Sequence, residues 1–214
     1  SSAASDVYKR QCYGSGDSFF YSVRTDDRLG GYLATKYLIE QGHHRIAIVT
    51  GELKAHGVNS ERYQGYLDAL CEAGLTPAHD DVFEGLVGYD HGLEVAEELA
   101  RTRRDITALF ASADITAIGL INGLHAAGLR VPEDVSVIGF DDVEYAKMCC
   151  PGLTTMRQNI MEKGRQAARL MIEAVQDHSL PREERIIPME LIERGTVKRV
   201  DGNQAYAQRP VSAF

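Results

Sequence analysis

The stretch ALFASADITAIGLINGLHAAGLRVPEDVSVIGFDD, residues 108–142, decides the fold. Its two apolar runs, Ala108–Ala111 and Val135–Phe140, are short and bounded by polar or turn residues, as buried strands are. Between them, Asp114 is expected to cap a helix over Ile115–Ala127 that a glycine ends. A strand, a crossover helix and a second strand together predict a βαβ unit of a parallel sheet.

The same alternation continues on both sides of this unit. Helices are predicted where apolar residues recur three or four positions apart, and strands where short apolar runs lack that period. The further predicted strands are Ser18–Val23, Arg45–Thr50, a weak one around Val82 and Phe83, Leu153–Met156, and Ile186–Leu191. Because Pro188 interrupts the last of these strands, it is expected at a sheet edge. Two further helices are predicted to begin at Asp26–Asp27 and at Ser60. Two more are predicted to cover His91–Arg101 and Asn159–Asp177. The chain is thus predicted to be an α/β protein whose parallel sheets are flanked by helices.

The composition is that of an ordinary globular protein with an acidic surface. Of the 214 residues, 31 are acidic and 23 basic, which gives a formal net charge of −8. Nucleic-acid binding normally leaves a basic footprint, so these residues themselves are not expected to bind DNA. No apolar run approaches the roughly 18 residues that a membrane span needs. The first residues lack the apolar core of a signal peptide, so neither membrane insertion nor export is predicted.

Polar side chains follow the predicted strands at their carboxyl ends. They are Asp26 and Asp27 after the first strand, Arg62 after the second, Asp114 after Ala108–Ala111, Asp141 and Asp142 after Val135–Phe140, and Arg157 and Gln158 after Leu153–Met156. Ligands of open parallel sheets bind outside these strand ends. Carboxylate, amide and guanidinium groups hydrogen-bond polyhydroxylated or otherwise polar molecules well. The sequence therefore predicts a site for a small polar ligand at this edge.

Four segments of the chain resemble the LacI/GalR family of transcription regulators. SVRTDDRLGGYLATKYLIEQGHHRIAIVTG (22–51) resembles that family's V-x-x-D-N-x-x-G-G, helix and G-H-x-x-I pattern, and NSERYQGYLDALCEAGL (59–75) its S-x-x-R-x-x-G-Y-x-x-A-L helix. FASADITAIGLINGLHAAGLRVPEDVSVIGFDD (110–142) is similar to F-A-x-N-D-x-x-A-x-G followed by V-P-x-D-V-S-V-x-G-F-D-D. PGLTTMRQNIMEKGRQAARLM (151–171) is similar to P-x-L-T-T-x-x-Q and the helix after it. The segments occur in the family's order and at compatible spacings.

The resemblance implies roles for individual side chains. Arg62 of S-x-x-R-x-x-G-Y and Asp141, the first aspartate of G-F-D-D, are expected to contact an effector. Gln158 fits a glutamine at the crossover between two lobes, Phe110 an aromatic that stacks on a sugar or a base, and Asp26 the acidic position of V-x-x-D-N. The chain departs from the family at two positions, since Asp27 and Ala113 each stand where an asparagine is usual.

Several of these side chains also have a purely structural interpretation. Asp26 and Asp114 are typical helix N-caps, Phe110 lies in a core strand, and an aspartate after the strand at 135–140 can cap the next helix. Both interpretations stay open for each residue. The candidate ligand-binding set is Asp26, Arg62, Phe110, Asp114, Asp141 and Gln158.

The resemblance further implies two Rossmann-like lobes, the first of them incomplete. Residues 17–42 and 157–183 are expected to form the partial first lobe, and residues 43–156 and 184–198 the second. Residues 1–16 are interpreted as a foreign or disordered leader and residues 199–214 as a flexible tail. The helix-turn-helix headpiece typical of the family is not found, which predicts an N-terminally truncated chain.

The expected function is to sense a small effector, a sugar or sugar derivative, within a homodimeric cytoplasmic regulator that binds operator DNA through the missing headpiece. A periplasmic sugar-binding protein of a transporter shares the fold and is the alternative. Catalysis is not expected, because no nucleophile elbow, P-loop or base–nucleophile pair is found. No cofactor is expected either. A metal site is not predicted, since His43 and His44 lack a third ligand at a useful spacing.

Overall fold

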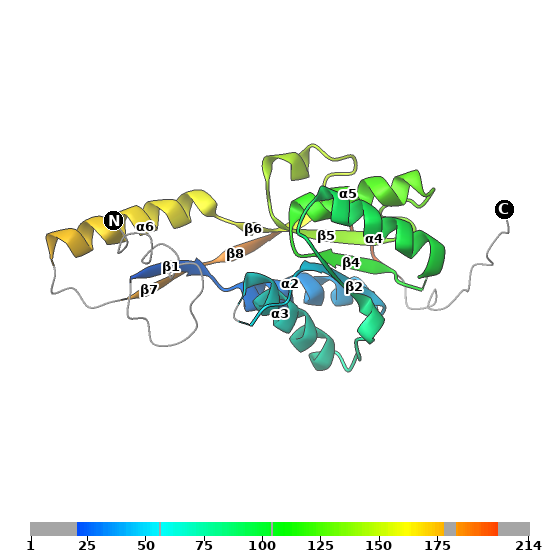
Figure 1. The fold of residues 1–214 in the computed structure, drawn as a ribbon, viewed down its shortest axis with the longest axis horizontal. Helices are drawn as coiled ribbons and strands as arrows, with labels where there is room; N and C mark the ends of the chain where they lie inside the picture. Colours follow the sequence, from blue (N-terminus) through cyan, green and yellow to red (C-terminus); the bar gives the residue numbers. More distant parts are fainter. Residues whose placement is uncertain (1–20, 56, 104, 178–182, 201–214) are drawn as a thin grey trace.

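The structure is a computed structural model that describes residues 21–55, 57–103, 105–177 and 183–200. It forms two bodies of unequal size (Figure 1). The larger body is built on a six-stranded sheet and the smaller one on a two-stranded sheet. The predicted α/β class is confirmed.

The six-stranded body has three layers. Its strands, in spatial order, are β3 (Val82–Gly85), β2 (Ile46–Gly51), β4 (Ala108–Ala111), β5 (Ser136–Asp141), β6 (Thr154–Gln158) and β8 (Met189–Ile192). Neighbouring strands are parallel except for β6 and β8, which are antiparallel. Helices α2 (Asp27–Glu40) and α3 (Val58–Glu72) cover one face, and α4 (Tyr89–Thr102) and α5 (Asp114–Ala126) cover the other (Figure 1).

Alternate residues of each central strand contribute to two separate hydrophobic cores. Ile48 and Phe110 pack beneath α2 and α3, whereas Val49 and Leu109 pack beneath α4 and α5. Successive side chains of a strand point to opposite faces, so a strand between two helical layers must be apolar on both sides. This explains why these strands read as unbroken apolar runs in the sequence.

The smaller body joins residues far apart in the chain. Strand β1 (Ser22–Thr25) pairs in parallel with β7 (Glu184–Ile187), and helix α6 (Ile160–Gln176) lies beside them (Figure 1). The side chain of Asn159 caps α6 by accepting a hydrogen bond from Glu162 N. Leu170 is the buried residue of this helix, while several of its large apolar side chains are exposed, namely Ile160, Met161, Met171, Ile172 and Val175.

The assignment of two predicted elements to lobes was wrong. The helix in residues 17–42 was expected in the partial lobe, but α2 packs on α3 and shares the core of the six-stranded body. Residues 184–187 were expected in the larger lobe, but β7 pairs with β1 in the smaller one. The chain therefore crosses between the bodies at Asp26, Asn159 and Pro188 rather than near Gly42, Met156 and Glu184. Helix α2 belongs to the larger body because glycines let it pack closely on α3. Strands β7 and β8 lie in different bodies because Pro188 breaks the strand between them.

Other element predictions differ only at their ends. Ser60 lies within α3, whose N-cap is Gly57, so Ser60 is not the expected cap. Strand β8 lies at the edge of its sheet, as Pro188 predicted. The predicted leader, 1–16, and most of the predicted tail lie outside the described residues. Val200, inside that predicted tail, donates a backbone hydrogen bond to Gln41 O at 2.8 Å, so the ordered chain continues beyond 198.

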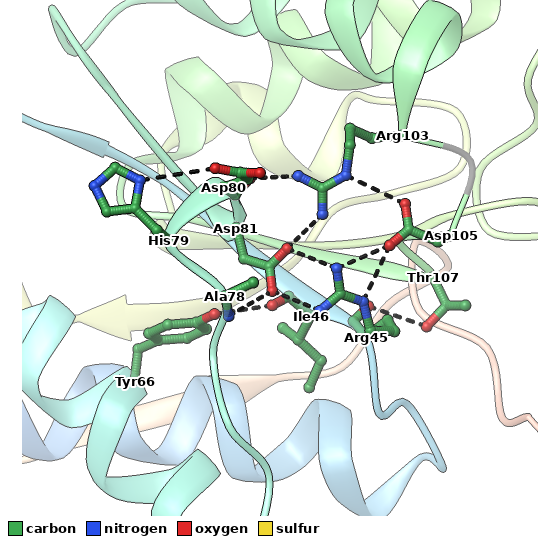
Figure 2. A network of polar contacts seen from close by, with 10 residues as sticks. All are labelled: Arg45, Ile46, Tyr66, Ala78, His79, Asp80, Asp81, Arg103, Asp105 and Thr107. Atoms are coloured by element: carbon green, nitrogen blue, oxygen red, sulfur yellow. Dashed lines mark hydrogen bonds and ion pairs between the residues drawn. The ribbon is translucent and has the colours of Figure 1, made fainter.

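A network of ion pairs fastens the amino ends of β2, β3 and β4 (Figure 2). Asp81 is almost fully buried and accepts from Arg45 at 2.8 and 3.0 Å and from Arg103 at 2.6 Å. Asp105 accepts from both arginines as well. This network lies at the opposite end of the strands from the predicted ligand site, so its role is structural.

Candidate functional site

Polar side chains converge where the two bodies meet. Thr25 ends β1, Asp141 ends β5 and Gln158 ends β6, while Arg62 approaches from the first turns of α3. These are carboxyl ends of parallel strands, the edge at which sheets of this type bind ligands. The structure therefore brings together three of the predicted site residues, Arg62, Asp141 and Gln158.

Arg62 is the centre of the cluster and is only 6% exposed. Its Nε and Nη2 both lie 2.8 Å from Oδ1 of Asp27, and Nη1 donates to the carbonyl oxygen of Ser112. Its Cζ lies 3.7 Å from the centroid of the Phe140 ring, a cation–π geometry. A buried guanidinium needs such partners, because an unpaired buried charge is costly.

Close packing of α2 on α3 sets the position of Arg62. A Cβ atom at Gly31 would overlap the backbone carbonyl oxygen of Arg62, and one at Gly65 would overlap that of Arg28. Glycine at these two positions lets the helix backbones approach. The approach brings Asp27, at the start of α2, against Arg62.

Asp141 is held by an unusual backbone conformation. Asp141 and Asp142 have φ angles of 117° and 57°, in the left-handed region that few L-residues adopt. The carboxylate of Asp142 is anchored by Arg157 and Arg194, both at 2.6 Å. Asp141 instead accepts from Nε2 of Gln158 at 2.7 Å, and its Oδ1 lies 3.8 Å from Nη2 of Arg62.

The two neighbouring aspartates have opposite pKa shifts. Burial raises the pKa of Asp141, and the charge of Arg62 and the hydrogen bond from Gln158 offset this only in part. Burial also acts to raise the pKa of Asp142, but hydrogen bonds from Arg194 and Arg157 outweigh it and leave that pKa below its usual value. Asp142 is thus a structural anchor, while the side chain of Asp141 stays 26% exposed to solvent.

Gln158 connects the crossings between the two bodies. Besides donating to Asp141, its side-chain oxygen accepts from the hydroxyl of Thr25 at 3.1 Å. Thr25 precedes the first crossing and Gln158 the second, and Met189, the partner of Gln158 in the sheet, follows the third. A change in the angle between the bodies must therefore act on the hydrogen bond between Thr25 of β1 and Gln158 of β6.

Three predicted site residues do not join the cluster through a polar side-chain contact. Asp26 caps α2 by accepting from Leu29 N at 3.0 Å. Phe110 is fully buried beside Phe140 and offers no face for stacking. Asp114 is also fully buried and accepts from Thr155 Oγ1 at 2.6 Å and Val143 N at 2.8 Å, so it braces β5 against β6. It does not cap α5, whose N-cap Ala113 has no side-chain hydrogen bond.

Asp27, like Thr25, belongs to the cluster but is not among the predicted ligand residues. The sequence marked it as a departure from the expected asparagine but gave no sign that it faces Arg62. Two adjacent acidic residues after a strand were the available signal. Which of the two caps the helix and which meets Arg62 depends on how α2 crosses α3.

Two open hollows lie away from this cluster. A groove of about 980 Å³ follows edge strand β3 and α4, and a smaller one of about 340 Å³ lies beside Tyr145 and Cys149. Arg62 and Asp141 line neither of them. His43 is buried with Nδ1 3.0 Å from Thr107 Oγ1 and Nε2 3.2 Å from Lys198 O.

Neither a metal-binding group nor a membrane-spanning helix is found in the part of the chain that the structure describes. Among these residues, no group of three or more His, Cys, Asp or Glu side chains is placed to hold a metal ion. None of the helices built from residues 21–55, 57–103, 105–177 and 183–200 is both long and apolar enough for a bilayer crossing.

The chain is similar to known regulators. The family described as periplasmic binding protein-like domain matches residues 35–197. The HTH-type transcriptional repressor PurR of Vibrio atlanticus (strain LGP32) is 41% identical over 175 residues, which are 80% of this chain and 51% of the repressor. A LacI family transcriptional regulator from Enterococcus faecium, crystallised with bound ribose, is 32% identical with a TM-score of 0.79 over 87% of this chain and 69% of that one. A complex of the transcriptional regulator CelR with cellobiose is 33% identical, also with a TM-score of 0.79, over 86% of this chain and 56% of that one.

These similarities extend over both bodies of the structure. The chain spans about half the length of the curated relatives that it matches. The family match covers most of the chain, and the regulator from Enterococcus faecium is covered over more than two thirds of its length. The resemblance that four sequence motifs suggested is thereby confirmed. The chain belongs to the LacI/GalR family of transcriptional regulators and carries its periplasmic binding protein-like domain.

Proposed function

We propose that the protein senses a small, polar, sugar-like effector between its two bodies and converts binding into a change in DNA binding. The observation that carries this proposal is the cluster of Arg62, Asp27, Asp141 and Gln158 at the point where the chain crosses between the bodies. Relatives with bound ribose and cellobiose support a carbohydrate as the effector class.

The cluster is chemically suited to a ligand rich in hydroxyl groups. Carboxylate oxygens of Asp141 accept hydrogen bonds from hydroxyls, and N–H groups of Arg62 donate to their oxygens. Charge-assisted hydrogen bonds of this kind are stronger than neutral ones when water is excluded. Nothing in the proposal requires catalysis or a cofactor, because the protein acts by binding.

Signalling would work through the angle between the two bodies. An effector that contacts both bodies stabilises the arrangement in which it makes more contacts, and so shifts the population toward it. Gln158 and Thr25 sit at two of the crossings and sense this change directly. We propose that in the whole protein, a cytoplasmic homodimer, the shift repositions DNA-binding headpieces on the operator. The relatives favour a regulator over the receptor of a transporter.

Calorimetric titration of the full-length protein against ribose, cellobiose and other neutral sugars tests the proposal. Arg62→Ala and Asp141→Ala are each expected to weaken the best ligand by about 10-fold or more, since each removes a charge-assisted hydrogen bond. Arg28→Ala is the matched control, because Arg28 forms an exposed ion pair with Asp68 on the same two helices. Unchanged affinity in both cluster variants would contradict the assignment of the site.

A further inference from the structure

The guanidinium of Arg62 already holds an anion. Nε and Nη2 both face Oδ1 of Asp27 at 2.8 Å, and Nη1 donates to Ser112 O. An arginine that recognises a phosphate or a carboxylate usually offers two N–H groups of its planar fork to that ligand. Here Asp27 occupies that position from within the protein.

A second carboxylate, that of Asp141, lies beside this ion pair. Oδ1 of Asp141 lies 3.8 Å from Nη2 of Arg62, whereas the carboxylate of Asp26 caps α2. Lys163 of α6 is a cation whose charge acts on Asp141, and Arg24 is paired with Glu184. An anionic ligand that approached Arg62 would have to displace Asp27 or lie against two carboxylates.

A neutral ligand meets no such obstacle. Hydroxyl and N–H groups donate to the free lone pairs of Asp141, which is the most exposed oxygen-bearing partner of Arg62. The remaining N–H groups of Arg62 stay available for a neutral oxygen. The Arg62–Asp27 pair thus acts as a rigid, already neutralised element of the site.

We propose that Asp27 makes the effector site selective for uncharged ligands and against their phosphorylated or carboxylated forms. This inference rests on the proposed function, because it concerns the same site. It assigns the selectivity to one residue, at which this chain has a carboxylate in place of the expected amide. Like charges placed side by side at an interface are a strong means of rejecting a wrong partner.

The first experiment tests whether Arg62 can bind an anion, and it does not require that the effector be known. Thermal unfolding of the full-length protein is followed in inorganic phosphate and in sodium chloride of equal ionic strength. The wild type is expected to show no phosphate-dependent rise in Tm, whereas Asp27→Asn shows one that the further change Arg62→Ala abolishes. Asp68→Asn, which removes the same charge from an exposed ion pair with Arg28, is expected to behave as the wild type does.

The second experiment compares matched ligands by calorimetry, namely ribose with ribose 5-phosphate and glucose with glucose 6-phosphate. Asp27→Asn is expected to increase the affinity for the phosphorylated sugar relative to the neutral sugar by about 10-fold or more. A wild-type protein that gains stability from phosphate through Arg62, or that prefers the phosphorylated member of a pair, overturns the inference even if Asp27→Asn does not fold. If no sugar binds while the phosphate results are as expected, the sugar proposal fails and the inference about Arg62 stands.

Discussion

Asp114 is a carboxyl group whose titration the fold has moved close to neutral pH. Burial raises its pKa to about 7, against the hydrogen bonds from Thr155 and Val143 that act to lower it. An unfolded aspartate titrates near pH 4. The folded protein therefore binds more protons than the unfolded chain between about pH 4 and pH 7, and the stability contributed by Asp114 declines as the pH rises through this range.

The substitution Asp114→Asn should remove this dependence. Asparagine can accept from Val143 N with its carbonyl oxygen and donate to Thr155 Oγ1 with its amide, so both contacts survive. We expect the variant to be more stable than the wild type by about 1–3 kcal/mol near pH 8, with a smaller difference near pH 4. Urea unfolding at several pH values measures this, with Asp68→Asn as the control. A difference that does not vary with pH would count against the raised pKa.

The titration of His43 makes the stability of the fold depend on pH in the direction opposite to that of Asp114. Burial lowers its pKa to about 4, although the carbonyl oxygen of Lys198 acts to raise it. Because an unfolded histidine titrates near 6.5, the unfolded chain binds the extra proton, and stability falls as the pH decreases from about 6.5 to about 4. His43→Gln, which retains a donor toward Lys198 O, is expected to lose this acid-side decline. Urea unfolding between about pH 4 and pH 7 measures this decline. A variant whose free energy of unfolding still falls toward acid pH as steeply as that of the wild type would contradict the prediction.

At the scale of elements, the glycines in the α2–α3 interface fix the geometry of the site. Gly31→Ala places a methyl group on the carbonyl of Arg62 and forces the two helices apart. We expect a loss of about 1–3 kcal/mol in the free energy of unfolding together with weaker effector binding. Gly164→Ala in α6 is the control, since a Cβ there meets nothing, and it is expected to stabilise by about 0.5–1 kcal/mol. Equal effects of the two substitutions on urea unfolding would refute the argument.

The elements themselves were largely predictable from the sequence, but their partners were not. The apolar run Ala108–Ala111 and the helix after Asn159 have the predicted positions, because period and capping are local signals. The body to which α2 belongs depends on Gly31 and Gly65, and helix periodicity carries no information about a close crossing. The tendency of ligands to bind at the carboxyl ends of parallel strands predicted where the cluster lies. It did not distinguish Asp27 from Asp26 or show that Phe110 faces the core.

At the scale of the whole molecule, the two bodies differ in how much they bury. The six-stranded body has helices on both faces. Within residues 21–55, 57–103, 105–177 and 183–200, the smaller body consists of two strands and one helix, in which Leu170 is the single buried residue. Two-stranded sheets are marginally stable on their own. Local opening is expected to be easier where few apolar contacts hold the backbone.

Hydrogen exchange should reveal this difference. In the 214-residue chain, we expect the amides of β1, β7 and α6 to exchange faster than those of β2, β4 and β5, because the smaller body opens without unfolding the larger one. Exchange followed by mass spectrometry measures it. Helix α4, with Val95 and Leu99 among its four buried residues, is the control for α6. Equal protection of the two helices would show that the bodies open as one unit.

The order of strands has a consequence for synthesis on the ribosome. Residues 27–158 supply the four α-helices and five of the six strands described for the larger body, so that body can assemble while the rest of the chain is still being made. Strand β1, by contrast, leaves the exit tunnel long before its partner, since Ser22 pairs with Glu184. The edge of β1 that β7 later covers therefore stays open until residues 184–187 are translated, and the delay makes that edge a natural binding site for chaperones.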